Sequence, residues 1–501
     1  MQAIQKNLFN HGSTIMKALL FLLVVYCPFF LHLGDLPVRI WDEARLIANT
    51  LGMEKNGNYL VTYFNGLPDM WNTKPPLLIW IQLFFLKLIG NEELSFRLPS
   101  AIAGFLTILT IMLLFARHLK SYWFGLIAAL VLVTANGYIG DHVVRTADYD
   151  ALLTFFMTFY ALCFFLFLET GKQKYLHLFF TGLALAVLTK SIQGVLFLPL
   201  LGIYLLFTGN LLRLVRNKWV YLDFTLIVIL ISGYYLLRES VNPGYLEAVY
   251  NNELGGRYFA TTENHLQGFD FYLNLLISEQ FGYWFMFLML GFFAGLAHPK
   301  GIIRNMILYV TLLIAGYLLI ISSAGTKLAW YVAPIYPLLS ILAAFPIYWI
   351  FLHVIEFKGF RIRYNTYFFP AIFLISVFIV PYWNIIDKVY KPREISSETE
   401  FYLISHLLQD AVKGKTNIDG HLICFSDYNV HLTYYTDQLN EHNKNVHFID
   451  PALVREGNSL ICPQPYVAAM IKEKFLTEET GSYYTIKFLK INGTRNSNNQ
   501  P

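Results

Sequence analysis

Charged side chains follow or interrupt several apolar segments of this chain, where they could bind and activate a substrate that carries a phosphate. The first group is Trp41-Asp42-Glu43-Ala44-Arg45, and the second is Thr73-Lys74-Pro75-Pro76. Charge close to a bilayer is costly and is usually retained for chemistry or ion handling. Lysine, arginine and tyrosine donate strong hydrogen bonds to phosphate oxygens, and a carboxylate can serve as a general base or a metal ligand.

The composition indicates that membrane helices must position these groups. Of the 501 residues 56% are hydrophobic and only 14% are charged, and the mean hydropathy is +0.48. Soluble domains are about a quarter charged. Apolar runs of about 18 residues or more recur, which is long enough to cross a hydrocarbon core about 30 Å thick. The sequence therefore predicts an all-α polytopic membrane protein. The net charge of +4 does not point to nucleic acid, because the lysine and arginine residues lie in short loops.

The apolar pattern predicts about eleven transmembrane helices, and the loops between them predict their orientation. With the N-terminus in the cytoplasm, every predicted inside loop is basic, as the positive-inside rule requires. The short stretch 77–89 is interrupted by Gln82 and Lys87, and counting it as a span would turn all later basic loops outward. We therefore expect it to lie on the outer surface as an interfacial helix. The predicted spans are 15–34, 98–116, 123–140, 151–168, 175–189, 192–208, 219–237, 277–297, 305–323, 329–352 and 366–387.

Two domains and a tail are expected along the chain. Residues 1–390 form the membrane domain, whose juxtamembrane loop 35–97 and later loop 238–276 face the outer side. After Lys391-Pro392 the chain becomes polar, and alternating stretches within 391–491 predict a small α/β domain on the outer side. Residues 492–501 are expected to be disordered.

The predicted topology places an unusual set of polar residues on the outer face. Helix packing could gather them at one cavity, but several also have ordinary structural roles. Asp42 and Arg45 could be a surface ion pair, Asp148 a helix cap, and Lys190 a lysine that extends to the membrane surface. The set comprises Asp42, Glu43, Arg45, Lys74, Asp141, Arg145, Asp148, Lys190, Glu253, Arg257, His265, Lys327 and Tyr331.

In their order along the chain these motifs resemble the bacterial glycosyltransferases that use polyprenyl-phosphate-linked sugars. This is the aminoarabinose-transferase branch, which is related to protein O-mannosyltransferases and has the GT-C fold. The resemblance covers most of residues 15–390. It is carried by Asp42-Glu43-Ala44-Arg45, Phe64-Asn65-Gly66-Leu67-Pro68, Lys74-Pro75-Pro76-Leu77, Phe96-Arg97-Leu98-Pro99-Ser100, Arg145-Thr146-Ala147-Asp148, Leu188-Thr189-Lys190-Ser191, Arg257-Tyr258 ahead of His265, and Lys327-Leu328-Ala329-Trp330-Tyr331.

The resemblance implies a multi-pass enzyme of the bacterial inner membrane with a periplasmic active site. It would move a sugar from a polyprenyl-phosphate carrier, for which undecaprenyl phosphate is expected, to an acceptor, with inversion at the anomeric carbon. Asp42 matches the residue that acts on the acceptor, and opposite charge on Arg45 would keep it ionised. The expected catalytic residues are Asp42, Arg45 and Asp148, and the expected donor-phosphate residues are Lys74, Lys190, Arg257 and Tyr331.

Two departures from the family pattern bear on metal binding. Some members have a glutamate before the matching lysine and a histidine after the glutamate of the later loop. Here Thr73 and Leu254 stand at these positions, and neither is a good metal ligand. We therefore expect no cofactor and no metal, with Glu253 and His265 as the remaining candidate ligands of a divalent ion.

Other functions also fit parts of the pattern. A transporter or flippase of an anionic lipid or solute would carry polar residues in a membrane cavity, but near mid-bilayer rather than at span ends. A scaffold whose C-terminal domain recruits partners leaves the outer charges unexplained. Within the enzyme hypothesis the sugar remains open, and so does the acceptor, which could be lipid A, an exported protein or a glycan.

Overall fold

The structure is a computed structural model that describes residues 11–140, 142–255, 267–299, 301–356, 368–425 and 427–495. The chain divides into two compact units. The helical unit comprises Met1–Leu33 and Thr50–Lys391, and the C-terminal unit comprises Gly34–Asn49 and Pro392–Pro501. The division thus falls inside α3 (Asp42–Asn56) and groups the residues just before and within its first turns with the C-terminal domain.

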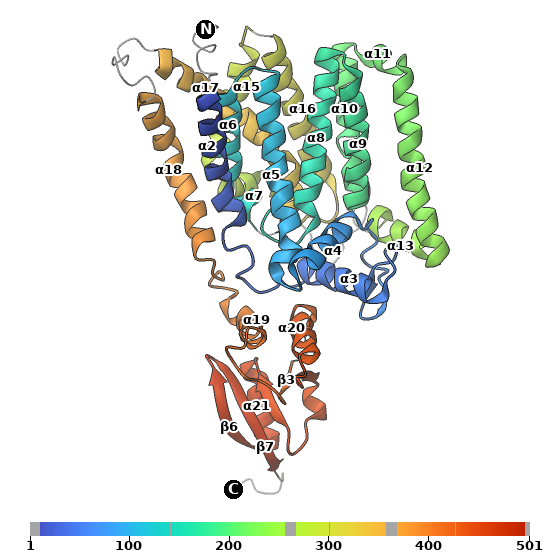
Figure 1. Ribbon diagram of the computed structural model, residues 1–501, viewed down its shortest axis with the longest axis vertical. Helices are drawn as coiled ribbons and strands as arrows, with labels where there is room; N and C mark the ends of the chain where they lie inside the picture. Colours follow the sequence, from blue (N-terminus) through green and yellow to red (C-terminus); the bar gives the residue numbers. More distant parts are fainter. Residues whose placement is uncertain are drawn as a thin grey trace. The chain divides into compact units, whose positions relative to one another are not determined.

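Long apolar helices lie side by side in the helical unit (Figure 1). Seven of those described are long and apolar enough to cross a membrane. They are α5 (Glu93–Arg117), α8 (Tyr149–Thr170), α9 (Gln173–Lys190) with η1 (Ser191–Val195), α12 (Lys218–Val241), α16 (Gly301–Ser323), α17 (Tyr336–Glu356) preceded by η4 (Ala329–Ile335), and α18 (Phe368–Tyr390).

Four further apolar elements occupy the other predicted spans. Three contain apolar helical stretches of 10–17 residues, and the fourth is a pair of helices bent by 115°, which makes an eighth span when it is counted as one. They are α2 (His11–Phe30), α6 (Tyr122–Val133), α10 (Leu198–Thr208), and α14 (Phe271–Leu275) with η3 (Leu276–Gln280) bent against α15 (Gly282–Leu296). The prediction of an all-α polytopic fold is confirmed, and each predicted span overlaps one of these elements in sequence. About eleven spans were expected, whereas seven or eight elements of the described chain are long and apolar enough to cross a membrane.

Short elements cap the two ends of the bundle. In Figure 1, α4 (Leu77–Ile89) and α13 (Tyr245–Val249) lie at one end, and α11 (Leu211–Val215) lies at the other. The stretch 77–89 is thus one short helix that packs against α5. Gln82, which interrupts its apolar run, is buried. Its side-chain oxygen accepts a hydrogen bond from the Thr50 hydroxyl at 2.8 Å, which compensates the cost of burying the amide. The remaining short elements are β1 (Tyr63–Phe64), β2 (Leu67–Pro68), α7 (Asn136–Ile139) and η2 (Tyr250–Gly255).

A mixed five-stranded sheet forms the C-terminal unit together with three helices. Its strand order is β4-β3-β5-β7-β6, with β3 parallel to β4 and β5, and β7 antiparallel to β5 and β6. Cys424 and Cys462 are buried in its core as free thiols. The elements are α19 (Thr399–Val412), β3 (Leu422–Cys424), α20 (Val430–Glu441), β4 (His447–Ile449), η6 (Pro451–Leu453), β5 (Ser459–Cys462), α21 (Pro465–Lys474), β6 (Phe475–Tyr483) and β7 (Ile486–Thr494).

The last strand extends further than the sequence indicates. Residues 492–494 were expected in the disordered tail, but they belong to β7, where Gly493 and Thr494 pair with the start of β6. The polar composition there suits an edge hairpin, since backbone hydrogen bonds hold it rather than burial of its side chains. The rest of the expected tail, 496–501, lies outside the described residues.

A buried histidine makes the C-terminal unit sensitive to acid. His431 on α20 is fully buried, and neither ring nitrogen has a hydrogen-bond partner within the described part of the chain. Its ring stacks on Phe401 at 5.6 Å between centroids. Burial, with a contribution from the charge of Arg39, lowers the pKa of His431 from 6.5 to about 4. The unfolded chain therefore takes up the proton first, so stability is full above pH 6.5 and is lost as the pH falls towards 4.

His431→Phe is expected to remove this acid dependence. A shift of this size corresponds to about 3 kcal/mol between the two pH limits. Hydrogen exchange of peptides from 422–462 in the full chain, compared at pH 7 and pH 5, measures the effect. His447→Gln, at an exposed position of β4, is the control and should keep the wild-type difference. If hydrogen exchange in His431→Phe still differs between pH 7 and pH 5 as in the wild type, another titrating group causes the acid dependence.

Candidate functional site

The beginning of α8 carries a buried carboxylate at one end of the helical unit. Asp148 caps this helix by accepting a hydrogen bond from the backbone N–H of Tyr149 at 2.6 Å. Its other oxygen lies 2.7 Å from Nδ1 of His142. Burial raises the pKa of Asp148, but the hydrogen bond and charge of His142, together with the charge of Lys190, outweigh it and hold the pKa below its usual range. Asp148 is therefore an anion that a neighbouring histidine orients.

His142 connects this carboxylate to a cavity in the helical unit. Its ring stacks on Trp330 with centroids 3.6 Å apart and planes within 14°. The backbone φ of His142 is +63°, in the left-handed region that side chains rarely adopt, so the chain is held there at some conformational cost. The cavity has a volume of about 550 Å³ and is lined by Asn136, Gly137, Gly140, His142, Ser278, Glu279, Gln280, Ala329, Trp330 and Lys388. Amides, a hydroxyl and an aromatic face suit a ligand rich in hydroxyl groups.

A buried ion pair lies two residues further along α8. The Lys190 ammonium group lies 2.8 and 2.6 Å from the two oxygens of Asp150, and both side chains are at most 4% exposed. The same ammonium group lies 5.5 Å from the centroid of the Tyr331 ring. The chain breaks directly after this lysine, at Ser191 with φ +46°, where α9 gives way to η1. Lys190 is thus neutralised by a carboxylate and fixed between α8, α9 and η4.

Asp150→Asn is expected to destabilise the protein by about 3–5 kcal/mol, because it leaves a buried ammonium group without its counter-charge. The double variant Asp150→Asn with Lys190→Met should recover much of this loss, since neither charge then remains buried. Thermal unfolding of the full chain in one detergent measures both. If the losses of unfolding free energy in Asp150→Asn and in Lys190→Met alone add up to the loss in the double variant, the ion pair makes no coupled contribution to stability.

Lys74 is another of the expected phosphate ligands, and its side chain is mostly buried. Its ammonium group is 3.5 Å from Oε1 of Glu253 and 5.6 Å from the centroid of the Tyr149 ring. The Thr73 hydroxyl donates to the same Glu253 oxygen at 3.3 Å. The loop is further fixed by Tyr245, whose hydroxyl donates to the backbone carbonyl of Thr73 at 2.6 Å. Lys74 is thereby linked through Tyr149 to the residues flanking it on α8, Asp148 and Asp150.

Glu253, a candidate metal ligand from the sequence, belongs to the same group. It lies in η2, a π-helical turn of a kind that occurs frequently at functional sites. Because an ammonium group already faces one of its oxygens, a divalent ion there would have to compete with that positive charge. His265 and Arg257 lie outside the described residues, so their expected roles stay predictions.

Two other polar residues of the outer set have structural partners. Arg145 donates to backbone carbonyls near the end of α2, at 3.0 Å to Pro28 and 2.8 Å to Leu31. This contact suits a cation, since the last carbonyls of a helix carry partial negative charge. Lys327 donates to the carbonyls of Ala324 and Gln267. Both residues hold loops in place, and Asp141 lies outside the described residues.

The segment that carries Asp42 belongs to the C-terminal unit and is held there by tyrosine hydroxyls. The backbone N–H of Val38 donates to Tyr435 at 2.9 Å, and that of Ile40 donates to Tyr402 at 3.2 Å. Trp41 has φ +68° and stacks on Tyr428 with centroids 4.3 Å apart. A bulky residue in this conformation persists only where its surroundings determine it. The backbone is therefore constrained immediately before Asp42.

An ion-pair network fixes the same segment. The Arg39 guanidinium forms two contacts with the carboxylate of Glu394, at 2.5 and 3.2 Å. His406 lies 2.9 Å from the same carboxylate, and the guanidinium lies over the Tyr402 ring. The backbone N–H of Arg39 donates to Glu43 at 2.7 Å, which ties the network to the first turn of α3. Asp42 and Arg45 are the first and fourth residues of that helix and so lie on one face.

Sequence reasoning missed several residues of these groups. Asp150 left a signal, since a carboxylate within an apolar helix is a candidate functional residue by default. Trp330 stands in the motif that ends at Tyr331, but the sequence did not indicate its contact with His142. His142 and Glu394 left no signal, because their residue types are common in loops and the partner of Glu394, Arg39, is 355 residues away.

Part of the chain is similar to a known protein family and to a sequence relative. The family model described as dolichyl-phosphate-mannose-protein mannosyltransferase matches residues 73–235, which include Lys74, Asp148 and Lys190. An uncharacterized protein of Aquifex aeolicus (strain VF5) is 30% identical over 337 residues, which are 66% of this chain and 63% of that protein. The chain thus spans less than two thirds of the length of this relative.

Solved structures with low sequence identity share the fold. ArnT from Cupriavidus metallidurans, in a crystal structure with bound undecaprenyl phosphate, is 16% identical and covers 96% of this chain and 98% of its own, with a TM-score of 0.67. The oligosaccharyltransferase AglB from Archaeoglobus fulgidus, in complex with an inhibitory peptide and a dolichol-phosphate, is 10% identical and covers 95% of this chain and 74% of its own, with a TM-score of 0.51.

Proposed function

We propose that this chain is a glycosyltransferase with the GT-C fold, which transfers a sugar from a polyprenyl-phosphate carrier to an acceptor, with inversion. The acceptor atom is an oxygen of a lipid, a protein or a glycan at the outer face of a bacterial inner membrane. The bond that forms joins this oxygen to the anomeric carbon. The bond that breaks joins the anomeric carbon to the carrier phosphate, which leaves with the electron pair.

One observation carries the proposal. Four segments far apart in sequence bring Lys74, Asp148, Lys190 and Tyr331 together at one end of the helical unit, connected through Tyr149 and Asp150. Polar groups that meet at helix ends favour chemistry at the membrane surface. A transporter would more often carry them at broken helices near the middle of the bilayer.

The residues divide between the leaving group and the acceptor. Lys74, Arg257 and the Tyr331 hydroxyl stabilise the negative charge that grows on the leaving phosphate, which is the largest electrostatic change in the reaction. The Lys190 ammonium group lies beside the Tyr331 ring, and the carboxylate of Asp150 balances its charge. Asp42, which lies on the same face of α3 as Arg45, takes the proton of a hydroxyl acceptor or orients an acceptor that is already ionised. His142, which is paired with Asp148, borders the cavity beside Trp330, and we assign this cavity to the sugar.

A direct transfer assay tests this function. The purified full chain is incubated with radiolabelled sugars on polyprenyl phosphate and with lipid A, a Ser/Thr-containing peptide or a glycan. Label that moves to one acceptor, at a rate proportional to enzyme, supports the proposal. If the label stays on the carrier while protein-dependent movement of the lipid across a bilayer is detected, the flippase hypothesis replaces it.

Glu394→Gln is expected to lower kcat about tenfold or more with little change in KM for the carrier. The substitution weakens the pair with Arg39 that fixes the segment before Asp42, and small displacements of a catalytic group are costly. Glu400→Gln, on the exposed face of α19, is the matched control. If Glu394→Gln instead raises KM for the carrier and leaves kcat unchanged, the Arg39–Glu394 pair supports carrier binding rather than the position of Asp42.

A further inference from the structure

A basic pocket lies near α11, at the end of the helical unit opposite α4 and α13 (Figure 1). Its volume is about 480 Å³, and its lining residues are Phe167, Gly171, Gln173, Arg213, Arg216 and Asn217. Arg213 donates to the backbone carbonyl of Leu168 at 3.3 Å and lies over the Phe167 ring. Gly171 has φ +70°, and a Cβ atom there would lie 2.5 Å from Nη2 of Arg213. The glycine therefore leaves the room that this guanidinium occupies.

The guanidinium groups of the pocket have no carboxylate partner within ion-pair distance among the described residues. Within the described residues, neither Arg213 nor Arg216 forms an ion pair, and both are exposed. Two carboxylates lie on the neighbouring helices, but each has another partner. Glu169 accepts a hydrogen bond from Asn305 at 2.9 Å, and Asp223 pairs with His177. An anion entering the pocket would thus meet two guanidinium groups.

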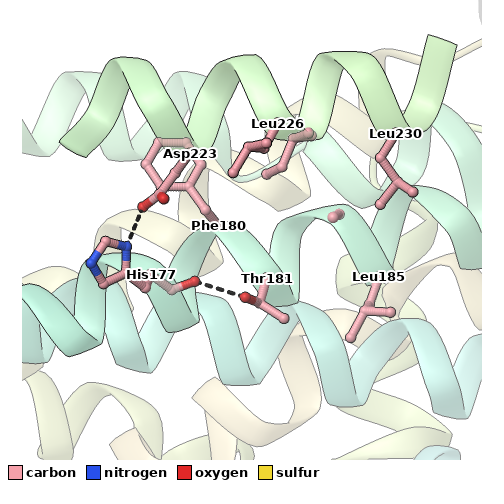
Figure 2. A pocket seen from close by; sticks show the side chains of 9 residues that line it. His177, Phe180, Thr181, Leu185, Asp223, Leu226 and Leu230 are labelled. Carbon is pink, nitrogen blue, oxygen red and sulfur yellow. Dashed lines mark hydrogen bonds and ion pairs between the residues drawn. The ribbon is translucent and has the colours of Figure 1, made fainter. Parts of the chain in front are cut away.

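A separate apolar groove lies between α9 and α12. Figure 2 shows His177 and Asp223 at one end of the groove, with Leu185 and Leu230 at the other. Nδ1 of His177 lies 2.7 Å from the Asp223 carboxylate. The groove has a volume of about 240 Å³ and is lined beyond this pair by Phe180, Thr181, Ala184, Leu185, Leu226, Ile227 and Leu230. Its surface beyond the ion pair is almost entirely hydrocarbon.

The pocket and the groove are adjacent along the same two helices. Gln173 and His177 are four residues apart on α9, so they lie on one face one turn apart. Gln173 accepts a hydrogen bond from Asn217 at 3.0 Å, which bridges α9 and α12 one turn before the His177–Asp223 pair does. On α11, Leu212 and Val215 are 64% and 48% exposed beside the two arginines, as expected of a segment that contacts lipid.

We propose that this end of the bundle binds an anionic phospholipid, with the phosphate held by Arg213 and Arg216 and one acyl chain in the groove between α9 and α12. Guanidinium groups bind phosphate oxygens in pairs, and basic pockets between transmembrane helices on the cytoplasmic side are known to hold anionic headgroups. A free phosphate would not occupy the apolar groove, whereas an acyl chain would fill it. The groove therefore favours a lipid over a free phosphate. The site lies at the opposite end of the bundle from Lys74 and Asp148 and does not depend on the proposed transfer reaction.

Native mass spectrometry of the full chain with dioleoyl phosphatidylglycerol tests the proposal. In Arg213→Gln with Arg216→Gln, binding should weaken about 30-fold, if each arginine contributes about 1 kcal/mol near a lipid phosphate. Arg117→Gln with Arg304→Gln removes the same charge from other exposed positions in predicted inside loops and should leave binding unchanged. Equal binding by all three proteins, or equal loss in both double variants, would overturn the site.

Two further comparisons separate the headgroup from the chain and this site from the carrier site. Ala184→Phe narrows the groove and should weaken dioleoyl phosphatidylglycerol at least fivefold while leaving the dihexanoyl lipid unaffected. If inorganic phosphate displaces the lipid completely, or if Ala184→Phe has no effect, the acyl-chain part of the proposal is wrong. Lys74→Met should retain the phospholipid, and its loss there would mean that the lipid had occupied the carrier site instead.

Discussion

Asp42→Asn should lower kcat for sugar transfer by about 10²–10⁴-fold while the protein stays folded, because loss of a general base typically costs that much. The amide has nearly the same shape as the carboxylate but cannot accept the acceptor's proton. Its position at the start of α3, after the constrained Trp41 and beside Glu43, is otherwise preserved. Initial rates at saturating carrier measure the effect.

Glu54→Gln is the matched control for this substitution, since Glu54 lies on the same helix at an exposed position. It should retain the wild-type rate. Full activity of Asp42→Asn, with an unchanged unfolding temperature, would remove Asp42 from the mechanism and leave Asp148 as the candidate base.

Lys74→Met is expected to lower kcat/KM by about 10²–10³-fold, the size of effect seen when one preorganised electrostatic contact to a transition state is removed. The substitution also leaves Glu253 without its ammonium partner, so some stability will be lost. The double variant Lys74→Met with Glu253→Gln separates the two effects. It should recover stability but not activity.

Lys87→Met serves as the control for Lys74→Met, because this exposed lysine of α4 donates to the Tyr59 hydroxyl and lies over its ring. Its rate should match that of the wild type. If the Lys74→Met and Glu253→Gln double variant regains both stability and rate, Lys74 acts only as a structural partner of the glutamate.

Much of the fold could be predicted because hydropathy and loop charge are local properties of the sequence. The stretch 77–89 is an example, since Lys87 and its short length argued against a span, and it forms the short helix α4. The partner of Gln82 could not be predicted, because Thr50 lies on a separate helix.

The candidate site was only partly predictable, because its pairings join distant segments. Lys190 was expected to bind phosphate, and its pairing with Asp150 depends on how α8 packs against α9. Arg145 was placed among the outer charges, and its actual partners are carbonyls of α2. The association of the Asp42 segment with the C-terminal unit rests on Tyr402, Tyr435 and Glu394, more than 350 residues away in sequence.

Binding of polyprenyl phosphate tests the central claim most directly. Native mass spectrometry of the purified full chain in nanodiscs would compare the wild type with Lys74→Ala combined with Arg257→Ala. We expect the wild type to retain the lipid and the double variant to lose it while still retaining phosphatidylglycerol. Equal retention of polyprenyl phosphate by both proteins would contradict the assignment of the carrier-phosphate site and favour a transporter over a glycosyltransferase.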